Sequence, residues 1–325
     1  MNTSNRLFFA DFTKLFAMFV VTWGHCAQCL SGETYPWMFG CQGLSIAFHM
    51  PLFMMISGYF LNPDKIKQVN WKSYIKSKFN RLMIPVLIWY PLYCILTIHK
   101  PYLWGFVNFY WFLSSMFLSY IIILIVCKIT GSRHISLILL SVVIVICLPF
   151  SSFLKVNFMY PLIWGGYFYQ LMVTRNAKLD KLILPVSAII SIVLLYFWNI
   201  DYSVYRAPFD VMDMNISTIK ALFIRLITGF IVSIFFISLF KKIENYTVIQ
   251  KLAKYGKYTL VMYTASFVLN GMMRKILTYI GASVTQPCWI ESLSLIWAIV
   301  VCLLCVLSAM LMERNRILSK FLLGC

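Results

Sequence analysis

Long apolar stretches dominate the chain, and short segments rich in lysine and arginine separate them. A helix needs about 20 mostly apolar residues to cross the hydrocarbon core of a bilayer. Stretches that approach this length lie near residues 7–28, 40–61, 82–98, 104–127, 134–151, 156–173, 182–200, 219–240, 258–278 and 289–312. The pattern predicts an all-α, polytopic membrane protein with about ten transmembrane helices.

The positive charges orient these helices. If the N-terminus lies in the cytoplasm, the segments on that side carry 20 of the 28 Lys and Arg residues, and the outer segments carry five. Cytoplasmic loops of membrane proteins are enriched in Lys and Arg. We therefore predict that both termini are cytoplasmic and that the protein is a multi-pass component of a bacterial cell (inner) membrane.

The composition excludes an ordinary soluble enzyme. Of the 325 residues, 61% are hydrophobic and 12% are charged, against about 45–50% and about 25% in soluble domains. The net charge of +18 would also suit a nucleic-acid-binding protein. Because most cations fall on the predicted cytoplasmic side, the excess charge reflects topology, and we expect a lipid bilayer and no nucleic acid as partner.

The chain is predicted to form one integral-membrane domain over residues 1–325, without a soluble domain. Residues 62–81 alternate lysines with apolar side chains, which is typical of an amphipathic helix lying in the cytoplasmic interface. Residues 201–217 form the longest predicted outer loop and carry three aspartates.

Ten cysteines occur in the chain, most of them inside the apolar stretches, where cysteine commonly acts as a small buried side chain. Cys26 and Cys29 lie beside His25, with Cys41 further along. A single C-x-x-C is weak support for a metal site, and we expect no metal. A disulfide from Cys26 or Cys29 to Cys41 is left open.

Three ionisable residues lie in the first apolar stretch: Asp11, Lys14 and His25. Lys14 and His25 are eleven residues apart, which places them within about 20° of one another around a helix and about 16 Å apart along it. Asp11 precedes Lys14 by three residues and can pair with it. Ionisable groups inside a membrane are functional candidates, although a snorkelling lysine and a structural histidine would produce the same pattern.

A second histidine, His49, lies within the second stretch, near Pro51 and the pair Ser57-Gly58. Pro51 removes a backbone donor, and such interruptions are tolerated beside cavities where other groups satisfy the backbone. Two histidines at membrane depth suggest proton chemistry on a bound hydroxyl or acyl group. Each histidine taken alone would more often be structural.

Five motifs follow one another along the chain: ADFTKLFAMFVVTWGH, FHMPLFMMISGYF, KFNRLMIP, YWFLSSMFLSY and LAKYGKYTLVMYTASFVL. The first has the spacing D-x-x-R-x(10)-H, with Lys14 in the place of the arginine. Together they resemble, in order, the motifs of the integral-membrane acyltransferase-3 family, and especially its branch similar to fucose 4-O-acetylases. The chain is similar to the stand-alone members of that family.

The chain departs from the family pattern at three positions. Lys14 replaces the usual Arg, and Lys78 replaces the first Arg of the basic pair that ends in Arg81. The charge is kept, but the bidentate geometry of a guanidinium is lost. Ser266 stands where many relatives carry a His, so no role of that His transfers to this chain.

The resemblance implies an O-acyltransferase that moves an acetyl or other short acyl group from acyl-CoA to a hydroxyl of a cell-surface or lipid-linked glycan. Acetyl-CoA would be the acyl-donor substrate, with Lys14, Lys78 and Arg81 binding its phosphates. His25 would act as general base or transient acyl carrier, with Asp11 and His49 also in the catalytic set. Lys78 and Arg81 could equally serve only as cytoplasmic anchors.

The acceptor site is predicted from weaker signals. Tyr110 and Trp111 are either aromatic residues of the membrane interface or part of an acceptor platform. Ser57 either hydrogen-bonds substrate or only packs helices. Arg225 and Glu291 fall within apolar stretches and either pair with one another or serve another role.

A transporter or flippase for a glycan or small solute is the alternative function. Such proteins commonly contain inverted repeats with paired broken helices. The chain has one interrupted stretch early and no clear counterpart late, which favours the enzyme. A homodimer is left open.

Overall fold

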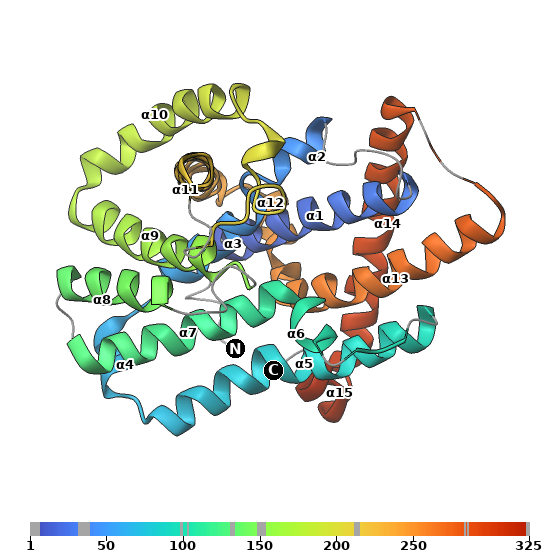
Figure 1. Ribbon diagram of the computed structural model, residues 1–325, viewed down its shortest axis with the longest axis horizontal. Coiled ribbons are helices and arrows are strands. Elements are labelled where there is room, and N and C mark those ends of the chain that lie inside the picture. Colours follow the sequence, from blue (N-terminus) through green and yellow to red (C-terminus); the bar gives the residue numbers. More distant parts are fainter. Residues whose placement is uncertain are drawn as a thin grey trace.

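The computed structural model describes residues 7–31, 40–97, 100–102, 104–130, 134–147, 154–210, 215–282, 284 and 286–322. Within these ranges all regular secondary structure is helical (Figure 1). The α-helices are α1 (Phe8–Ser31), α2 (Gly40–Ser45), α3 (His49–Tyr59), α4 (Pro63–Gln68), α5 (Trp71–Thr97), α6 (Gly105–Asn108), α7 (Trp111–Thr130), α8 (His134–Cys147), α9 (Val156–Arg175), α10 (Ala177–Tyr196), α11 (Ile216–Ile243), α12 (Thr247–Ala253), α13 (Thr259–Tyr279), α14 (Pro287–Glu313) and α15 (Arg316–Leu322). Two 3-10 turns, η2 (Ile200–Tyr202) and η3 (Lys254–Tyr258), complete the described elements.

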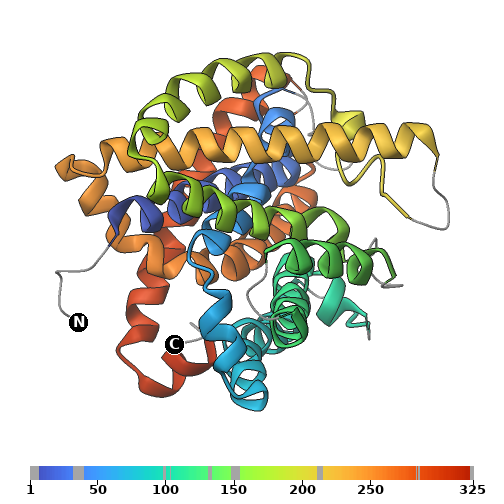
Figure 2. The ribbon, with the colours of Figure 1, turned by 90° about the vertical axis from the view of Figure 1, so that its left-hand side faces the viewer.

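Helix α1 lies in the interior and packs against α3, α11, α13 and α14. Helix α3 in turn packs against α9 and α11. Helix α11 is seen end-on in Figure 1 and runs across the molecule in Figure 2. This arrangement brings α1, α3, α9 and α11 together around the centre of the bundle.

Two glycines allow α3 and α9 to approach at backbone distance. A Cβ atom on Gly58 would collide with the carbonyl oxygen of Ile163, and one on Gly166 would collide with that of Met55. Only glycine fits where two helix backbones come this close. Gly58, in the second apolar stretch, therefore serves the packing of α3 against α9.

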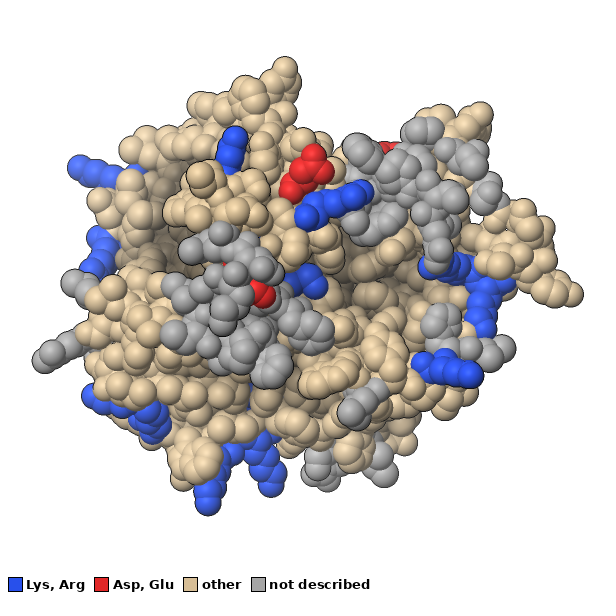
Figure 3. Space-filling model, in the orientation of Figure 1, with Lys and Arg blue, Asp and Glu red and all other residues tan. Residues whose placement is uncertain are grey.

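The outer helices present apolar side chains to their surroundings. Ile189 and Ile192 of α10 are 66% and 70% exposed, and Leu303 and Leu311 of α14 are 59% and 63% exposed. On the face shown in Figure 3, most Lys and Arg side chains lie toward the edges. Large exposed apolar surfaces flanked by charge are typical of helices that face lipid.

Five of the described helices are long and apolar enough to cross a membrane: α5, α7, α10, α11 and α14. Some central elements are shorter than the ten predicted spans, since α3 has 11 residues. Helices enclosed by protein need not be uniformly apolar, because their neighbours rather than lipid surround them. The described part of the chain is all-α and contains helices that could span a membrane, while the count of ten and the location of the termini stay predictions.

The second apolar stretch is interrupted at a different place from the one predicted. Residues 46–48 form a turn between α2 and α3, so His49 begins a short helix instead of lying in the middle of a long one. Pro51 is the third residue of α3, where its missing N–H has no intrahelical partner to lose. The prediction of a helix interruption at Pro51 was therefore wrong, and α3 continues through Ser57 and Gly58 to Tyr59.

The lysine-rich segment 62–81 does not form a separate amphipathic helix. Its first part is α4, capped by the Asn62 side chain, which accepts a hydrogen bond from the backbone N–H of Lys65. Its second part is the beginning of α5, which continues from Trp71 to Thr97. Nothing between Trp71 and Leu82 breaks a helix, so these turns extend the following apolar helix.

Candidate functional site

His49 is held in a defined orientation at the start of α3. Its Nδ1 atom lies 2.6 Å from the carbonyl oxygen of Ser45 in α2, and the side chain is 9% exposed. A carbonyl oxygen only accepts hydrogen bonds, so Nδ1 must be the donor in this contact. The neutral ring then carries its free lone pair on Nε2, which makes no hydrogen bond within the part of the chain that the structure describes.

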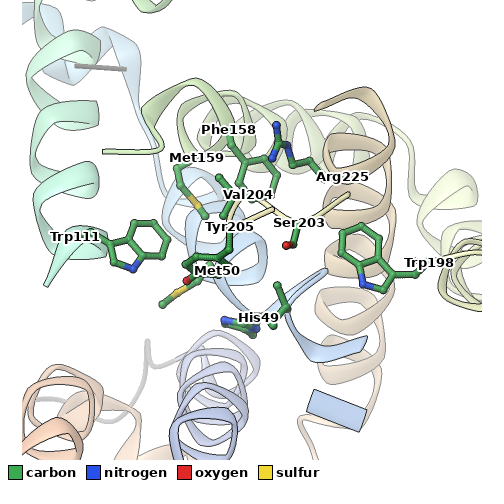
Figure 4. A pocket seen from close by; sticks show the side chains of 11 residues that line it. His49, Met50, Trp111, Phe158, Met159, Trp198, Ser203, Val204, Tyr205 and Arg225 are labelled. Atoms are coloured by element: carbon green, nitrogen blue, oxygen red, sulfur yellow. The ribbon is translucent and has the colours of Figure 1, made fainter. Parts of the chain in front are cut away.

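The His49 ring lines a pocket whose wall is built from five segments (Figure 4). Helix α7 contributes Trp111, α9 contributes Phe158, and α11 contributes Arg225. The segment that follows α10 contributes Ser203 and its neighbours. The predicted outer loop therefore folds back over the bundle and forms part of the pocket, which the sequence pattern did not indicate.

His25 lies close to this pocket on the last turns of α1. Its Nδ1 atom is 3.5 Å from the Oε1 atom of Gln28, and its ring lies 4.4 Å from that of Phe267 between centroids. The imidazoles of His25 and His49 are near enough to interact electrostatically. The structure thus brings together the two histidines that the sequence analysis selected.

Tyr110 and Trp111 occupy different environments. Tyr110 has no exposed surface, its hydroxyl donates to the carbonyl oxygen of Thr264 at 3.0 Å, and its ring lies 5.5 Å from that of Phe267. The alternative that Tyr110 is an aromatic residue of the membrane interface is therefore wrong, because interfacial aromatic residues contact the headgroup region and Tyr110 is fully buried. Trp111 lines the His49 pocket instead.

Lys78 and Arg81 form a basic group near Tyr120, and this group lies away from the His49 pocket. The Nζ atom of Lys78 is 3.8 Å from the centroid of the Tyr120 ring, and Tyr120 also interacts with Ser57 and Arg81. Neither Lys78 nor Arg81 forms an ion pair within the described ranges. Ser57 follows His49 by eight residues, about 12 Å along α3, so it lies with these cations rather than in the His49 pocket.

The predicted pairing at the start of α1 is present. Lys14 Nζ and Asp11 Oδ1 lie 3.4 Å apart, with both side chains partly exposed. An ion pair of this kind lowers the cost of placing both charges within an apolar stretch. Asp11 therefore orients Lys14 and lies away from the His49 pocket, to which it contributes no atom.

The cysteines beside His25 are held by one residue of α13. Cys26 Sγ donates to Asn270 Oδ1 at 3.4 Å, and Cys29 Sγ donates to the carbonyl oxygen of Asn270 at 3.1 Å. The side chain of Cys41 is outside the described residues, and so is any disulfide to it. Among the residues that are described, no three His, Cys, Asp or Glu side chains gather as metal ligands.

Arg225 is buried deep in the same pocket. The residue is 1% exposed, and its Nε, Nη1 and Nη2 atoms make no hydrogen bond with the described part of the chain. Its guanidinium carbon lies 5.7 Å from the centroid of the Phe158 ring. The ion pairs among the described residues do not include one between Arg225 and Glu291, which was one of the two alternatives from the sequence.

Comparison with known proteins gives a family-level match. A family model described as "Acyltransferase domain" matches residues 7–314. The nodulation protein NolL of Mesorhizobium japonicum (strain LMG 29417 / CECT 9101 / MAFF 303099) is 29% identical over 137 residues, which cover 37% of this chain and 36% of that protein. The chain thus matches little more than a third of this curated relative. No solved structure matches the chain.

Proposed function

Since this chain belongs to the acyltransferase domain family, we propose that it transfers a short acyl group, most simply acetyl, from acyl-CoA to a hydroxyl of a glycan. The acceptor is a cell-surface or lipid-linked sugar. Acyl-CoA is a cytoplasmic compound, and the distribution of Lys and Arg supports its entry from the side on which the cationic segments lie. The enzyme resides in a bacterial inner membrane.

The orientation of His49 is the observation that carries this proposal. Hydrogen bonding of Nδ1 to the Ser45 carbonyl leaves Nε2 available as a proton acceptor. The ring lines a pocket that also contains Trp111, an aromatic surface suited to the face of a sugar. A hydroxyl bound in this pocket would meet a general base of the correct tautomer.

His25 is assigned to the donor. It shares a face of α1 with Lys14, about 16 Å away along the helix, and an extended pantetheine arm spans such a distance. The ring nitrogen of His25 attacks the thioester carbonyl, the carbon–sulfur bond breaks, and the CoA thiolate leaves and takes up a proton. His25 then holds the acyl group until the acceptor arrives.

His49 completes the transfer. The acceptor hydroxyl gives its proton to Nε2 of His49 as its oxygen attacks the acyl carbon, and the bond to His25 breaks. The products are the glycan ester, free CoA and two histidines, and the proton held by His49 returns to solvent. Acyl-imidazoles react readily with water, so the apolar surroundings of the site protect the intermediate.

The phosphates of CoA are assigned to the basic group around Tyr120. Lys78 and Arg81 form no ion pair within the described residues and are therefore free to bind an anion. Lys14, near the beginning of α1, provides a third cation on the predicted cytoplasmic side. A guanidinium binds phosphate oxygens in a bidentate manner, while lysines act as point charges.

The test uses purified protein in nanodiscs with acetyl-CoA carrying a labelled acetyl group. Transfer of label to a glycan fraction from the parent organism, dependent on the protein, is the expected result. Mass spectrometry of surface polysaccharide from a deletion strain provides the cellular counterpart, with a loss of about 42 mass units for each acetyl group. An unchanged polysaccharide together with absent label transfer would refute the proposal.

A further inference from the structure

Arg225 carries a buried charge that forms no ion pair or hydrogen bond with the described residues. All three nitrogens of its guanidinium are buried and without a hydrogen bond in the described residues. Removing such a charge from water without a partner is strongly unfavourable. The five donors of a guanidinium match the two oxygens of a carboxylate or phosphate.

Lys155 places a second cation against two aromatic residues of the pocket wall. Its Nζ atom lies 4.2 Å from the centroid of Trp111 and 5.2 Å from that of Tyr205, two residues of the pocket wall. Burial lowers the pKa of Lys155 to about 8. Among the described residues that line the pocket there is no acidic side chain.

The backbone of Lys155 supports a functional reason for its position. It has φ of 56°, and no other described non-glycine residue has a positive φ. A left-handed conformation is unfavourable for a residue with a Cβ atom, because that atom approaches the following carbonyl oxygen. Such strain is retained where the surrounding structure requires a side chain in a particular place.

The segment that covers the pocket is fixed at both ends. Trp198 Nε1 donates to the carbonyl oxygen of Gly43 at 3.1 Å, which ties the segment to α2. Asn157 Nδ2 donates to the carbonyl oxygen of Phe209 at 2.6 Å, which ties it to α9. The segment that contributes Ser203 and Tyr205 to the pocket wall is therefore anchored at two points, with Arg225 lining the pocket and Lys155 against Trp111 and Tyr205 of its wall.

We propose that Arg225 and Lys155 bind an anionic group of the acceptor, either the carboxylate of an acidic sugar or the phosphate of a lipid-linked sugar. That the anion belongs to the acceptor rests on the proposed acyltransferase function, whereas the presence of an anion site does not. The site lies beside His49 and places the acceptor hydroxyl against Nε2. Arg225 supplies the bidentate contact and Lys155 the second charge.

The proposed anion site at Arg225 is distinct from the site assigned to the phosphates of CoA. Arg225 is nine residues, about 14 Å, from the beginning of α11. The lysines at the other end of this helix, Lys241 and Lys242, belong to the predicted cytoplasmic side. Lys78 and Arg81, assigned to CoA, lie near Ser57 rather than near His49.

The test measures ligand binding by calorimetry on the full-length protein in nanodiscs, without acyl-CoA. The probes are methyl glucuronoside, methyl glucoside and a short polyprenyl phosphate. We expect one of the two anions to bind at least about tenfold more tightly than the neutral glycoside, as one charged hydrogen-bonding contact allows. Preference for the glucuronoside identifies a carboxylate, and preference for the polyprenyl phosphate identifies a phosphate.

Substitutions locate the site. Arg225→Met removes the charge at similar volume and should weaken binding of the preferred anion at least tenfold, whereas Lys220→Met, at an exposed position of the same helix, should leave it unchanged. Lys155→Gly suits the positive φ and should also weaken binding, while Lys155→Arg should preserve it. Equal anion affinity in wild type and Arg225→Met, or no anion preference in wild type, would overturn the proposal.

Thermal unfolding adds a readout that does not require a ligand. Removal of an unpaired buried charge in favour of an apolar side chain stabilises a protein, so Arg225→Met should unfold at a higher temperature than wild type. A lower unfolding temperature would indicate a structural role and refute a ligand-binding one. Binding of acetyl-CoA is measured in the same preparation, so failure of the acyltransferase proposal would be seen separately.

Discussion

Nδ1 of His49 and the carbonyl oxygen of Ser45 lie 2.6 Å apart across the turn that separates α2 from α3. The contact uses one ring nitrogen for structure and leaves the other for chemistry. The Ser45 carbonyl also accepts the backbone N–H of Phe48 at 3.1 Å, so the His49 ring adds a second hydrogen bond to a carbonyl at the end of α2. The tautomer of the proposed base is thus set by the helix interruption itself.

Replacing His49 with asparagine tests the roles of its two ring nitrogens separately. In His49→Asn the amide Nδ2 can replace Nδ1 as donor to Ser45, but no atom replaces Nε2. We expect the variant to fold and to lose about 10²–10⁴-fold in acyl transfer, the contribution typical of a general base. Thermal unfolding and transfer of labelled acetyl provide the two measurements. Retention of near-normal transfer would show that His49 is not the base.

His25→Ala tests the proposed acyl carrier in the absence of an acceptor. Wild type incubated with labelled acetyl-CoA should retain label that hydroxylamine releases, as an acyl-imidazole does. His25→Ala should retain none, whereas His49→Asn should retain as much as wild type, because His49 acts only in the step that consumes the acceptor. Equal labelling in wild type and His25→Ala would contradict the carrier role.

Much of the fold follows from the hydrophobic pattern, since most apolar stretches after residue 100 became helices near their predicted limits. For example, the predicted stretch 289–312 corresponds to α14 (Pro287–Glu313), and 219–240 corresponds to α11 (Ile216–Ile243). These boundaries are readable because polar or charged residues flank each run. The break before His49 was not readable, because GLSIAFHM is mostly apolar on both sides of the turn.

The candidate site was predictable only in part. Spacing along one helix related Lys14 to His25, and the two histidines do lie near one another. The lack of a partner for Arg225 depends on which side chains α9 and the covering segment bring close, and that is a tertiary property. Lys155 is one of the five cations of the predicted outer segments. Nothing else singled it out, since the sequence pattern does not indicate a positive φ at a lysine.

Arg81→Ala tests the donor end. Loss of one bidentate phosphate contact should raise the acetyl-CoA concentration needed for half-maximal rate by about tenfold or more, with the acceptor dependence unchanged. Lys76→Ala, at another exposed position on the same helix, serves as the matched control and should behave as wild type. A change in acceptor dependence alone would place Arg81 outside the donor site.

Gly58→Ala tests the close contact between α3 and α9. A Cβ atom at this position collides with the backbone carbonyl of Ile163, which cannot move without shifting α9. We expect a loss of about 1–3 kcal/mol in stability, as for overpacked cores. Gly24→Ala in α1 is the control, because a Cβ atom there meets nothing within 4 Å, and its stability should be equal or slightly higher. Equal unfolding midpoints for the two variants would contradict the packing argument.

The pH dependence of anion binding follows from Lys155. Its pKa of about 8 means that the charge is present at pH 7 and largely lost at pH 9, so the preferred anion should bind progressively more weakly across this range. The neighbouring groups do not titrate there, because burial raises the pKa of Tyr205 to about 12, arginine stays charged, and histidine ordinarily titrates below pH 7. Lys155→Arg should bind the anion equally at pH 7 and pH 9, since a guanidinium keeps its proton. Calorimetry at both pH values measures the difference, and an identical decline in wild type and Lys155→Arg would assign the effect to another group.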